Sequence, residues 1–367
     1  MVTPGRGATQ RAYDPQYRVA PRDGSQGPAM KRIGFLSFGH WTDSPHSGTR
    51  SAKDVLLQSI DLAVAAEAVG ADGAYFRVHH FANQLASPFP LLAAIGARTS
   101  RIEIGTGVID MRYENPLYML ETAGAADLIS GGRLQLGISR GSPEQVIDGW
   151  RHFGYAPDEG ETDADMGRRH AEVFLQLLEG KGFAEPNPNP MFPNPPGLLR
   201  PEPHAPGLRD RIWWGSASNA TAVWAAKMGM NLQSSTLKAN ETNEPLHVQQ
   251  AKQMRAYREA WAEAGHAREP RVSVLRSIFP LMNDMDRAYF GRSKSSDQIG
   301  FIDNMEAVFG RTYAAEPEAL VADLASDQAI AEADTLLLAV PNQLGVDYNV
   351  HLLESILKHV APALGWR

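Results

Sequence analysis

The sequence predicts an α/β protein built as one closed (β/α)8 barrel, that is, a TIM barrel. Short apolar, β-branched segments alternate with helical patterns along most of the chain. Several helical patterns end at glycine and are followed within three residues by a strand, which is typical of an αβ turn. The alternation gives eight strands, and this number favours a closed barrel over an open doubly wound sheet.

The elements follow one another at regular spacing. The expected strands cover residues 33–38, 73–77, 102–108, 133–139, 211–215, 230–234, 271–279 and 334–340. The expected helices cover residues 55–69, 116–130, 165–180, 218–228, 246–265, 316–326 and 344–359. The 367 residues, of which 43% are hydrophobic, are enough for such a core.

Residues 102–141 show the repeating unit most clearly. A strand interrupted by glycines leads into a helix with Pro116 in its first turn, and a second strand follows. The helix is expected to have one inward stripe formed by Leu117, Leu120, Gly124 and Leu128. Both strands end in polar or glycine-rich corners, where an α/β barrel places its chemistry.

We expect one domain over residues 30–367. Residues 1–29 are rich in Arg, Gly and Pro without apolar periodicity, which predicts a disordered tail, and Met30 is a candidate natural start. Residues 183–209 contain nine prolines and predict a stiff surface arm. Residues 281–312 interrupt the alternation and are interpreted as an active-site lid.

Composition excludes several classes of function. The net charge of −7 and the absence of a basic run argue against a nucleic-acid partner. The chain has no cysteine, which excludes disulfides, thiolate metal sites and a cysteine nucleophile. No apolar run approaches the roughly 20 residues of a membrane span, so we expect a cytoplasmic protein without a membrane partner.

A histidine pair follows the second strand. His79 can exchange a proton near neutral pH or donate a hydrogen bond to a ring carbonyl. Adjacent histidines on an extended chain point in opposite directions, so His79 and His80 make a poor metal pair, and no metal is expected. The alternative is a pair of hydrogen-bonded structural histidines.

Two further strand ends carry polar groups. Ser139, Arg140 and Gly141 end the fourth strand, where a guanidinium can bind a phosphate or a flavin carbonyl; a surface salt bridge is the alternative. After the fifth strand, helix-opening residues favour a phosphate cradle, with simple N-capping by Ser218 as the alternative. These residues are Gly215, Ser216, Ala217 and Ser218.

Taken together, these motifs resemble the bacterial-luciferase-like, flavin-dependent monooxygenase family over residues 32–362. The resemblance is densest in Ile104-Gly-Thr-Gly-Val-Ile109, Asp127-Leu-Ile-Ser-Gly-Gly-Arg133, Leu136-Gly-Ile-Ser-Arg-Gly141 and Gly215-Ser-Ala-Ser218. It implies a luciferase-like (β/α)8 barrel that uses reduced FMN, supplied from solution or by a partner flavin reductase. O₂ would form a flavin hydroperoxide that oxygenates a small organic substrate. A homodimer is also expected, through the helices after strands two and three.

The resemblance also assigns roles to residues. His79 corresponds to the family's active-site histidine, Arg140 would contact the flavin or its phosphate, and Ser216 and Ser218 would contact the phosphate. A non-proline cis peptide is expected between Gly107 and Val108, beneath the flavin ring.

This chain departs from the family pattern at two positions. Val78 stands where the family has a glutamate before the histidine pair, which removes a carboxylate able to orient His79. Ser139 stands where luciferase has a reactive cysteine, so light emission is not implied. Two other functions remain open: hydride transfer by an F420-dependent oxidoreductase of the same fold, and a non-catalytic partner subunit resembling the luciferase β chain.

Overall fold

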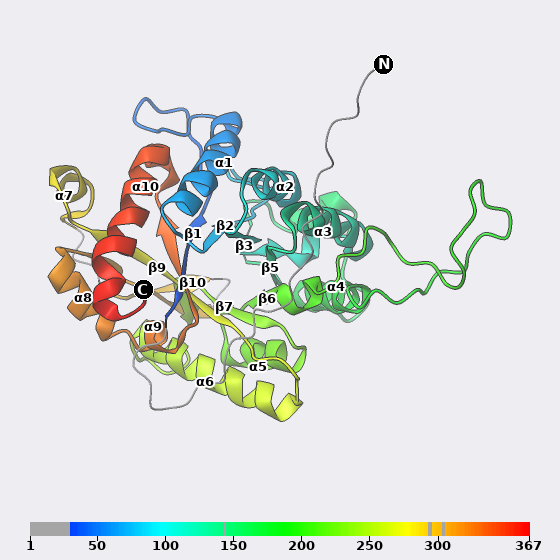
Figure 1. Ribbon diagram of the computed structural model, residues 1–367. Helices are drawn as coiled ribbons and strands as arrows, with labels where there is room; N and C mark the ends of the chain where they lie inside the picture. The colour runs from blue at the N-terminus through cyan, green and yellow to red at the C-terminus, as the bar shows by residue number, and fades with distance from the viewer. Residues whose placement is uncertain (1–29, 143, 293–295, 303–304) are drawn as a thin grey trace, which may run out of the picture.

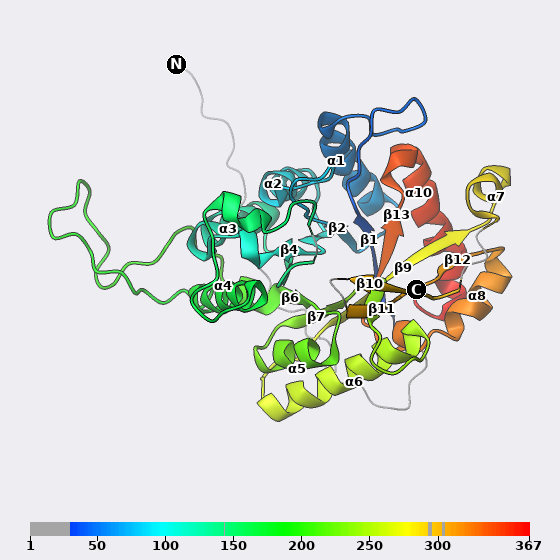
Figure 2. The same cartoon turned by 180° about the vertical axis from the view of Figure 1, so that it is seen from behind.

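The computed structural model describes residues 30–142, 144–292, 296–302 and 305–367. The predicted disordered tail, residues 1–29, lies outside the described residues. Within them the chain forms a closed barrel of parallel strands surrounded by helices (Figures 1 and 2).

The eight predicted strands form the barrel, within a few residues of their predicted bounds. They are β1 (Arg32–Ser37), β2 (Gly73–Phe76), β3 (Glu103–Thr106), β5 (Leu134–Ser139), β6 (Ile212–Gly215), β7 (Asn231–Ser234), β9 (Val272–Pro280) and β13 (Thr335–Val340). Each pairs in parallel with its neighbour, and β9 closes the ring by pairing with both β13 and β7. The predicted closed barrel is therefore confirmed.

The helices lie outside the strands. They are α1 (Ala52–Ala68), α2 (Pro88–Arg98), α3 (Pro116–Ser130), α4 (Asp163–Leu177), α5 (Asn219–Lys227), α6 (Leu246–Ala264), α8 (Pro317–Ala325), α9 (Gln328–Glu332) and α10 (Gly345–Ser355). A helix after the second strand was expected but without bounds; it is α2, whose first turn contains Pro88 and Pro90. Proline is tolerated there because the N–H groups of a first turn have no partner within the helix.

The predicted inward stripe of α3 is half wrong. Leu120 and Gly124 are buried, but Leu117 and Leu128 are 41% and 50% exposed. Small residues make up much of the buried face, together with Met119 and Leu120. The chain packs closely there, since a Cβ on Gly124 would lie 2.2 Å from the carbonyl oxygen of Pro203.

The two irregular segments differ in structure. Residues 183–209 project from the barrel (Figures 1 and 2), with a single isolated bridge between Ala184 and Leu199, as a surface arm should. The predicted lid instead contains α7 (Asp284–Phe290), β10 (Gln298–Ile302), β11 (Met305–Phe309) and the start of β12 (Thr312–Ala315). Strands β10 and β11 pair in antiparallel fashion, and β11 also pairs in antiparallel fashion with β8 (Leu237–Ala239). A short strand, β4 (Ile109–Asp110), pairs with β5.

No helix in the described ranges combines the length and apolarity that crossing a bilayer requires.

Strands β3 and β5 lie close together at Gly105. A Cβ there would lie 2.2 Å from the carbonyl oxygen of Gln135, which is backbone and cannot rotate away. We expect Gly105→Ala to lower the free energy of unfolding by about 1–3 kcal/mol, measured by urea denaturation. Gly310→Ala is the control, since its Cβ would first meet the movable end of the Leu246 side chain. Equal losses in the two variants would contradict the explanation.

Candidate active site

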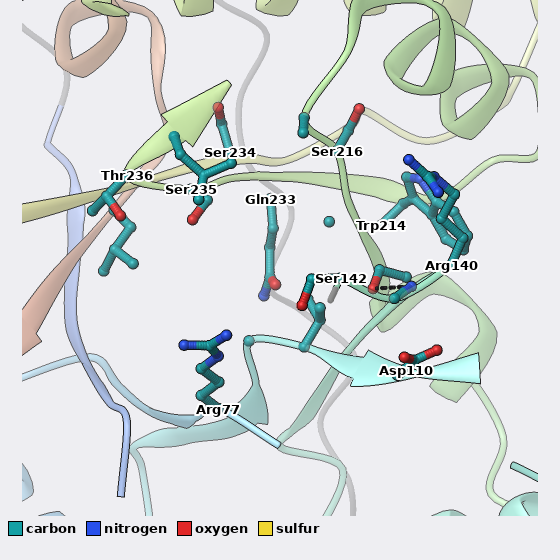
Figure 3. Close-up of a pocket in the computed structure, with 18 of the residues that line it drawn as sticks. Arg77, Asp110, Arg140, Ser142, Trp214, Ser216, Gln233, Ser234, Ser235 and Thr236 are labelled. Carbon is teal, nitrogen blue, oxygen red and sulfur yellow. Dashed lines mark hydrogen bonds between the residues drawn. The ribbon is translucent and has the colours of Figure 1, made fainter. Parts of the chain in front are cut away.

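A cavity of about 290 Å³ opens where the barrel strands end (Figure 3). Its size is at the lower end of typical small-molecule sites. The ten site residues predicted from the sequence all line it: His79, Gly107, Val108, Ser139, Arg140, Gly141, Gly215, Ser216, Ala217 and Ser218. The fold therefore brings together segments that are far apart in the chain. Met305 of the predicted lid also lines the cavity.

His79 lies against a carboxylate that sequence analysis did not identify. Its Nδ1 is 2.6 Å from Oε2 of Glu144, and both side chains are about 95% buried (5% and 4% exposed). The contact is close but poorly aligned for a hydrogen bond, and neither atom has another partner among the described residues. Catalytic contacts are often misaligned before a substrate binds. His79 lines the cavity, so its imidazole can meet a bound molecule there.

Glu144 restores the carboxylate that Val78 appeared to remove. It lies on the loop after β5, whereas the family pattern places a glutamate beside the histidine in sequence. Arg112 holds this loop by donating from Nη2 to the carbonyl oxygen of Ser142 at 2.7 Å. The same guanidinium binds Asp110 and Asp163, so the loop is fixed to a buried ion network.

The neighbouring histidine faces elsewhere. The ring of His80 stacks on Tyr113 with centroids 4.3 Å apart and does not line the cavity. Burial lowers the pKa of His80, while the charges of Glu144 and Asp110 oppose that shift. The opposite orientations agree with the sequence argument, and no cluster of three or more metal-ligating side chains occurs among the residues that the structure describes.

The floor of the cavity is backbone from the end of β3. The peptide bond between Gly107 and Val108 is cis, as predicted. A Cβ on Gly107 would lie 2.3 Å from Cδ1 of Leu36, and one on Gly215 would lie 3.0 Å from Cγ1 of Val108. Glycine at these positions keeps the strands close and the floor flat.

The turn after β5 presents Arg140 to the cavity. The backbone N–H of Gly141 donates to Oγ of Ser139 at 3.0 Å. Gly141 has a φ of +92°, and a Cβ there would lie 2.2 Å from Oδ2 of Asp110, so only glycine fits. Arg140 is half-buried and its guanidinium makes no hydrogen bond or ion pair within the described part of the chain.

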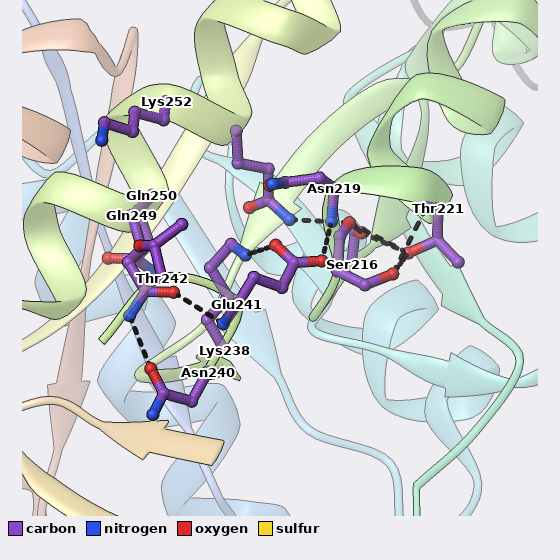
Figure 4. Close-up of polar contacts among 12 residues, drawn as sticks. Ser216, Asn219, Thr221, Lys238, Asn240, Glu241, Thr242, Gln249, Gln250 and Lys252 are labelled. Atoms are coloured by element: carbon purple, nitrogen blue, oxygen red, sulfur yellow. Dashed lines mark hydrogen bonds and ion pairs between the residues drawn. The ribbon is translucent and has the colours of Figure 1, made fainter. Parts of the chain in front are cut away.

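Three hydroxyl groups cluster at the N-terminus of α5 (Figure 4). Oγ1 of Thr221 lies 2.6 Å from Oγ of Ser216 and 2.9 Å from Oγ of Ser218. Ser218 also caps the helix by accepting from the N–H of Thr221. Figure 3 places Ser216 on the same side of the cavity as Arg140. A guanidinium and three hydroxyls at a helix N-terminus can bind a phosphate.

A second row of side chains holds this cluster in place. Glu241 accepts from the N–H of Asn219 at 3.1 Å and pairs with the buried ammonium of Lys238 (Figure 4). Gln253 donates to the carbonyl oxygen of Ser218 at 2.9 Å. Lys238 balances the carboxylate charge, which would otherwise repel an anion at the helix terminus.

Several cavity residues were not predicted from the sequence, and the positions of three of them show why. Thr221 sits inside a helix, where threonine is ordinary, and Glu144 follows a turn of unpredicted shape. Arg77 lies two residues before His79, at a strand end, and this position could have predicted that it lines the cavity.

The family model of luciferase-like monooxygenases matches residues 30–317. The chain belongs to the luciferase-like monooxygenase family. The match covers all ten predicted site residues, whereas much of α8 and all of α9 and α10 lie beyond it.

Individual relatives of this luciferase-like protein match more weakly. The 4-hydroxyprotoasukamycin monooxygenase of Streptomyces nodosus subsp. asukaensis is 32% identical over 156 residues, covering 41% of this chain and 39% of that protein. The chain spans about half the length of the curated relatives it matches.

Solved structures share the fold. The oxygenating constituent of 3,6-diketocamphane monooxygenase from the CAM plasmid of Pseudomonas putida, in complex with FMN, superposes with a TM-score of 0.65. It is 18% identical, and the alignment covers 91% of this chain and 99% of that one. An F420-dependent secondary alcohol dehydrogenase in complex with an F420–acetone adduct superposes at 0.59, with 16% identity and coverage of 91% and 99%.

Proposed function

We propose that this luciferase-like chain is a flavin-dependent monooxygenase that uses reduced FMN and O₂ to oxygenate a small organic substrate. One observation carries the proposal. The guanidinium of Arg140, which no described residue pairs with, and the hydroxyls of Ser216, Ser218 and Thr221 line one side of a cavity whose floor is the backbone of Gly107 and Val108.

These residues fit FMN in charge and shape. The phosphate would lie between Arg140 and the α5 terminus, because both offer hydrogen-bond donors on one side of the cavity, and Lys238 balances the charge of the Glu241 carboxylate at that terminus. The flat isoalloxazine ring would lie on the glycine-lined floor, where side chains on Gly107 or Gly215 would intrude. When bound, reduced FMN would supply the electrons that activate O₂.

His79 and Glu144 would supply the proton chemistry. The carboxylate of Glu144 lies against Nδ1 of the imidazole, so Nε2 would be the ring nitrogen that donates or accepts a proton at the reacting group. Burial of both side chains keeps water away from this contact and strengthens it. The residues that bind and orient are thus separate from the pair that moves a proton.

The second candidate is F420-dependent hydride transfer on the same fold. The shared fold of the F420-dependent alcohol dehydrogenase favours including it, and the His79–Glu144 pair would serve that chemistry equally well. A third candidate, the non-catalytic partner subunit, is disfavoured because that buried pair is present.

Anaerobic titration of the full chain with reduced FMN and with reduced F420 separates the candidates. We expect saturable binding of reduced FMN and a changed rate of its oxidation when O₂ is admitted. Binding of F420 alone would favour the hydride-transfer enzyme, and binding of neither would refute both.

Two further measurements test the proposed partners. Adding a flavin reductase would test the reductase partner, and the protein's mass in solution would test the homodimer. The exposed apolar candidates for the dimer interface on α3 are Leu117, Tyr118, Leu128 and Ile129.

Arg140→Gln is expected to weaken FMN binding by about 10- to 100-fold, because a charge-assisted contact to the phosphate is lost. The FMN affinity of Arg140→Lys should fall between those of Arg140→Gln and the wild type, since lysine keeps the charge but lacks the planar guanidinium. Quenching of FMN fluorescence measures both affinities. Riboflavin, which lacks the phosphate, is the matched ligand and should bind all three proteins alike. An equal loss for riboflavin would place Arg140 at the ring instead.

A further inference from the structure

Arg77 is a second guanidinium in the cavity. It follows β2, is half-buried and lines the cavity. Within the described ranges its side chain makes no hydrogen bond or ion pair, and its guanidinium carbon lies 5.2 Å from the ring centroid of Phe38. Figure 3 shows Arg77 and Arg140 on opposite sides of the cavity. A phosphate bound at Arg140 would therefore not neutralise the charge of Arg77.

The acidic side chains that line the cavity contact residues other than Arg77. Asp110 accepts three hydrogen bonds from the Arg112 guanidinium, and Glu144 lies against His79. Burial lowers the pKa of Arg77, and the charge of Glu144 opposes that shift. A half-buried cation that forms no direct ion pair with a described residue costs stability, and such a cost is typical of groups that bind a ligand.

The wall beside Arg77 is apolar. Leu36, Leu275 and Leu337 form a small buried cluster inside the barrel, and Phe38, whose ring meets Arg77, packs against it. All of these residues line the cavity. A cationic group beside one hydrocarbon wall matches an amphipathic acid better than a neutral alkanal or a polar metabolite.

We propose that the substrate is a small apolar carboxylic acid, with its carboxylate paired to Arg77 and its hydrocarbon body against the Leu36–Phe38 wall. This inference rests on the proposed function, because it takes the Arg140 end of the cavity for the cofactor. A carboxylate suits the site because its two oxygens match the planar fork of arginine. Arg77 thereby determines substrate specificity.

Calorimetric titration of the full chain with octanoate and with the neutral isostere octanamide tests the inference, with and without saturating FMN. We expect wild type to bind octanoate about 10- to 100-fold more tightly than octanamide, as loss of a charge-assisted contact implies. Arg77→Gln should remove that preference and leave octanamide binding unchanged, while Arg77→Lys should keep part of it. Arg151→Gln, an exposed arginine outside the cavity, is the matched control and should behave as wild type.

Each other outcome has a definite meaning. Equal binding of the two probes by wild type, or a preference that survives Arg77→Gln, overturns the inference. So does a loss of FMN affinity in Arg77→Gln with the octanoate preference intact, because Arg77 would then face the cofactor. A clear octanoate preference in a protein that binds no flavin would refute the proposed function and retain the acid site.

Thermal stability gives an independent readout. If Arg77 waits for a ligand, Arg77→Gln removes an unpaired half-buried charge and should leave the melting temperature unchanged or raise it. Octanoate should raise the melting temperature of wild type and not that of the variant. A clear drop in the melting temperature of Arg77→Gln would make the residue structural and overturn the inference.

Discussion

Replacing His79 with alanine is expected to lower turnover by about 10²- to 10⁴-fold, the usual contribution of a general acid or base, while FMN affinity stays near the wild-type value. The reason is geometric. His79 lines the cavity beside Glu144, at the end of β2, whereas the phosphate-binding groups lie after β5 and β6. The measurement is O₂ consumption and product formation with an acid that the cavity binds, alongside an FMN titration.

Glu144→Gln provides the matched variant for this pair. Glutamine keeps the shape of the side chain but removes the charge that holds the imidazole, so kcat should fall by less than in His79→Ala and KM should change little. Glu144→Asp should recover part of the loss. Unchanged turnover in His79→Ala would support the non-catalytic partner subunit or a different acid–base group, and an equal loss of FMN binding would make His79 part of the cofactor site.

Most of the barrel could be predicted from the sequence because each strand is a short apolar run. A helix, often ended by glycine, separates it from the next strand. Those signals are local, and the register and closure follow from them once eight strands are present. The same reasoning placed Arg140, Ser216 and His79 at strand ends, where parallel strands deliver side chains to one mouth. Position at a strand end was therefore the strongest predictor of the site.

What sequence analysis lacked were contacts between residues that no local pattern links. Glu144 reaches His79 from another strand's loop, and only the folded turn held by Arg112 brings it there. Leu117 and Leu128 have the spacing of an inward stripe, yet both are exposed, and the buried face of α3 is the one where Gly124 packs close to Pro203. In both cases tertiary packing overrides the local signal.

The second large effect is expected in stability, at Asp327. Its carboxylate is fully buried and accepts from Nε of Arg276 at 2.8 Å, from Oη of Tyr313 at 2.7 Å and from the N–H of Ile330 at 2.9 Å. It thus joins β9, β12 and the start of α9. Asp327→Ala should lower the free energy of unfolding by about 3–5 kcal/mol, because it leaves the buried guanidinium of Arg276 unpaired.

A pair of further variants tests that reason. Asp327→Asn keeps the cap on Ile330 but leaves Arg276 unpaired, and adding Arg276→Met removes the stranded charge. The double variant should therefore lose less stability than the two single losses added together, as urea denaturation would measure. Glu354→Ala breaks an exposed ion pair with Lys358 and is the control, with an expected loss below about 1 kcal/mol. Additive losses in the cycle would contradict the stranded-charge explanation.

The Asp327 contribution should also depend on pH in a defined direction. Burial alone would raise the pKa of Asp327, but the charge of Arg276 and the hydrogen bonds from Arg276 and Tyr313 hold it below its usual value. A carboxyl with a lowered folded-state pKa contributes its full stability above the unfolded value of about 3.9, and loses it as the pH falls through the folded value. The stability difference between wild type and Asp327→Asn should therefore be constant near neutral pH and shrink below about pH 4. A difference that grows on acidification would reverse the sign of this linkage and exclude the ion pair as its source.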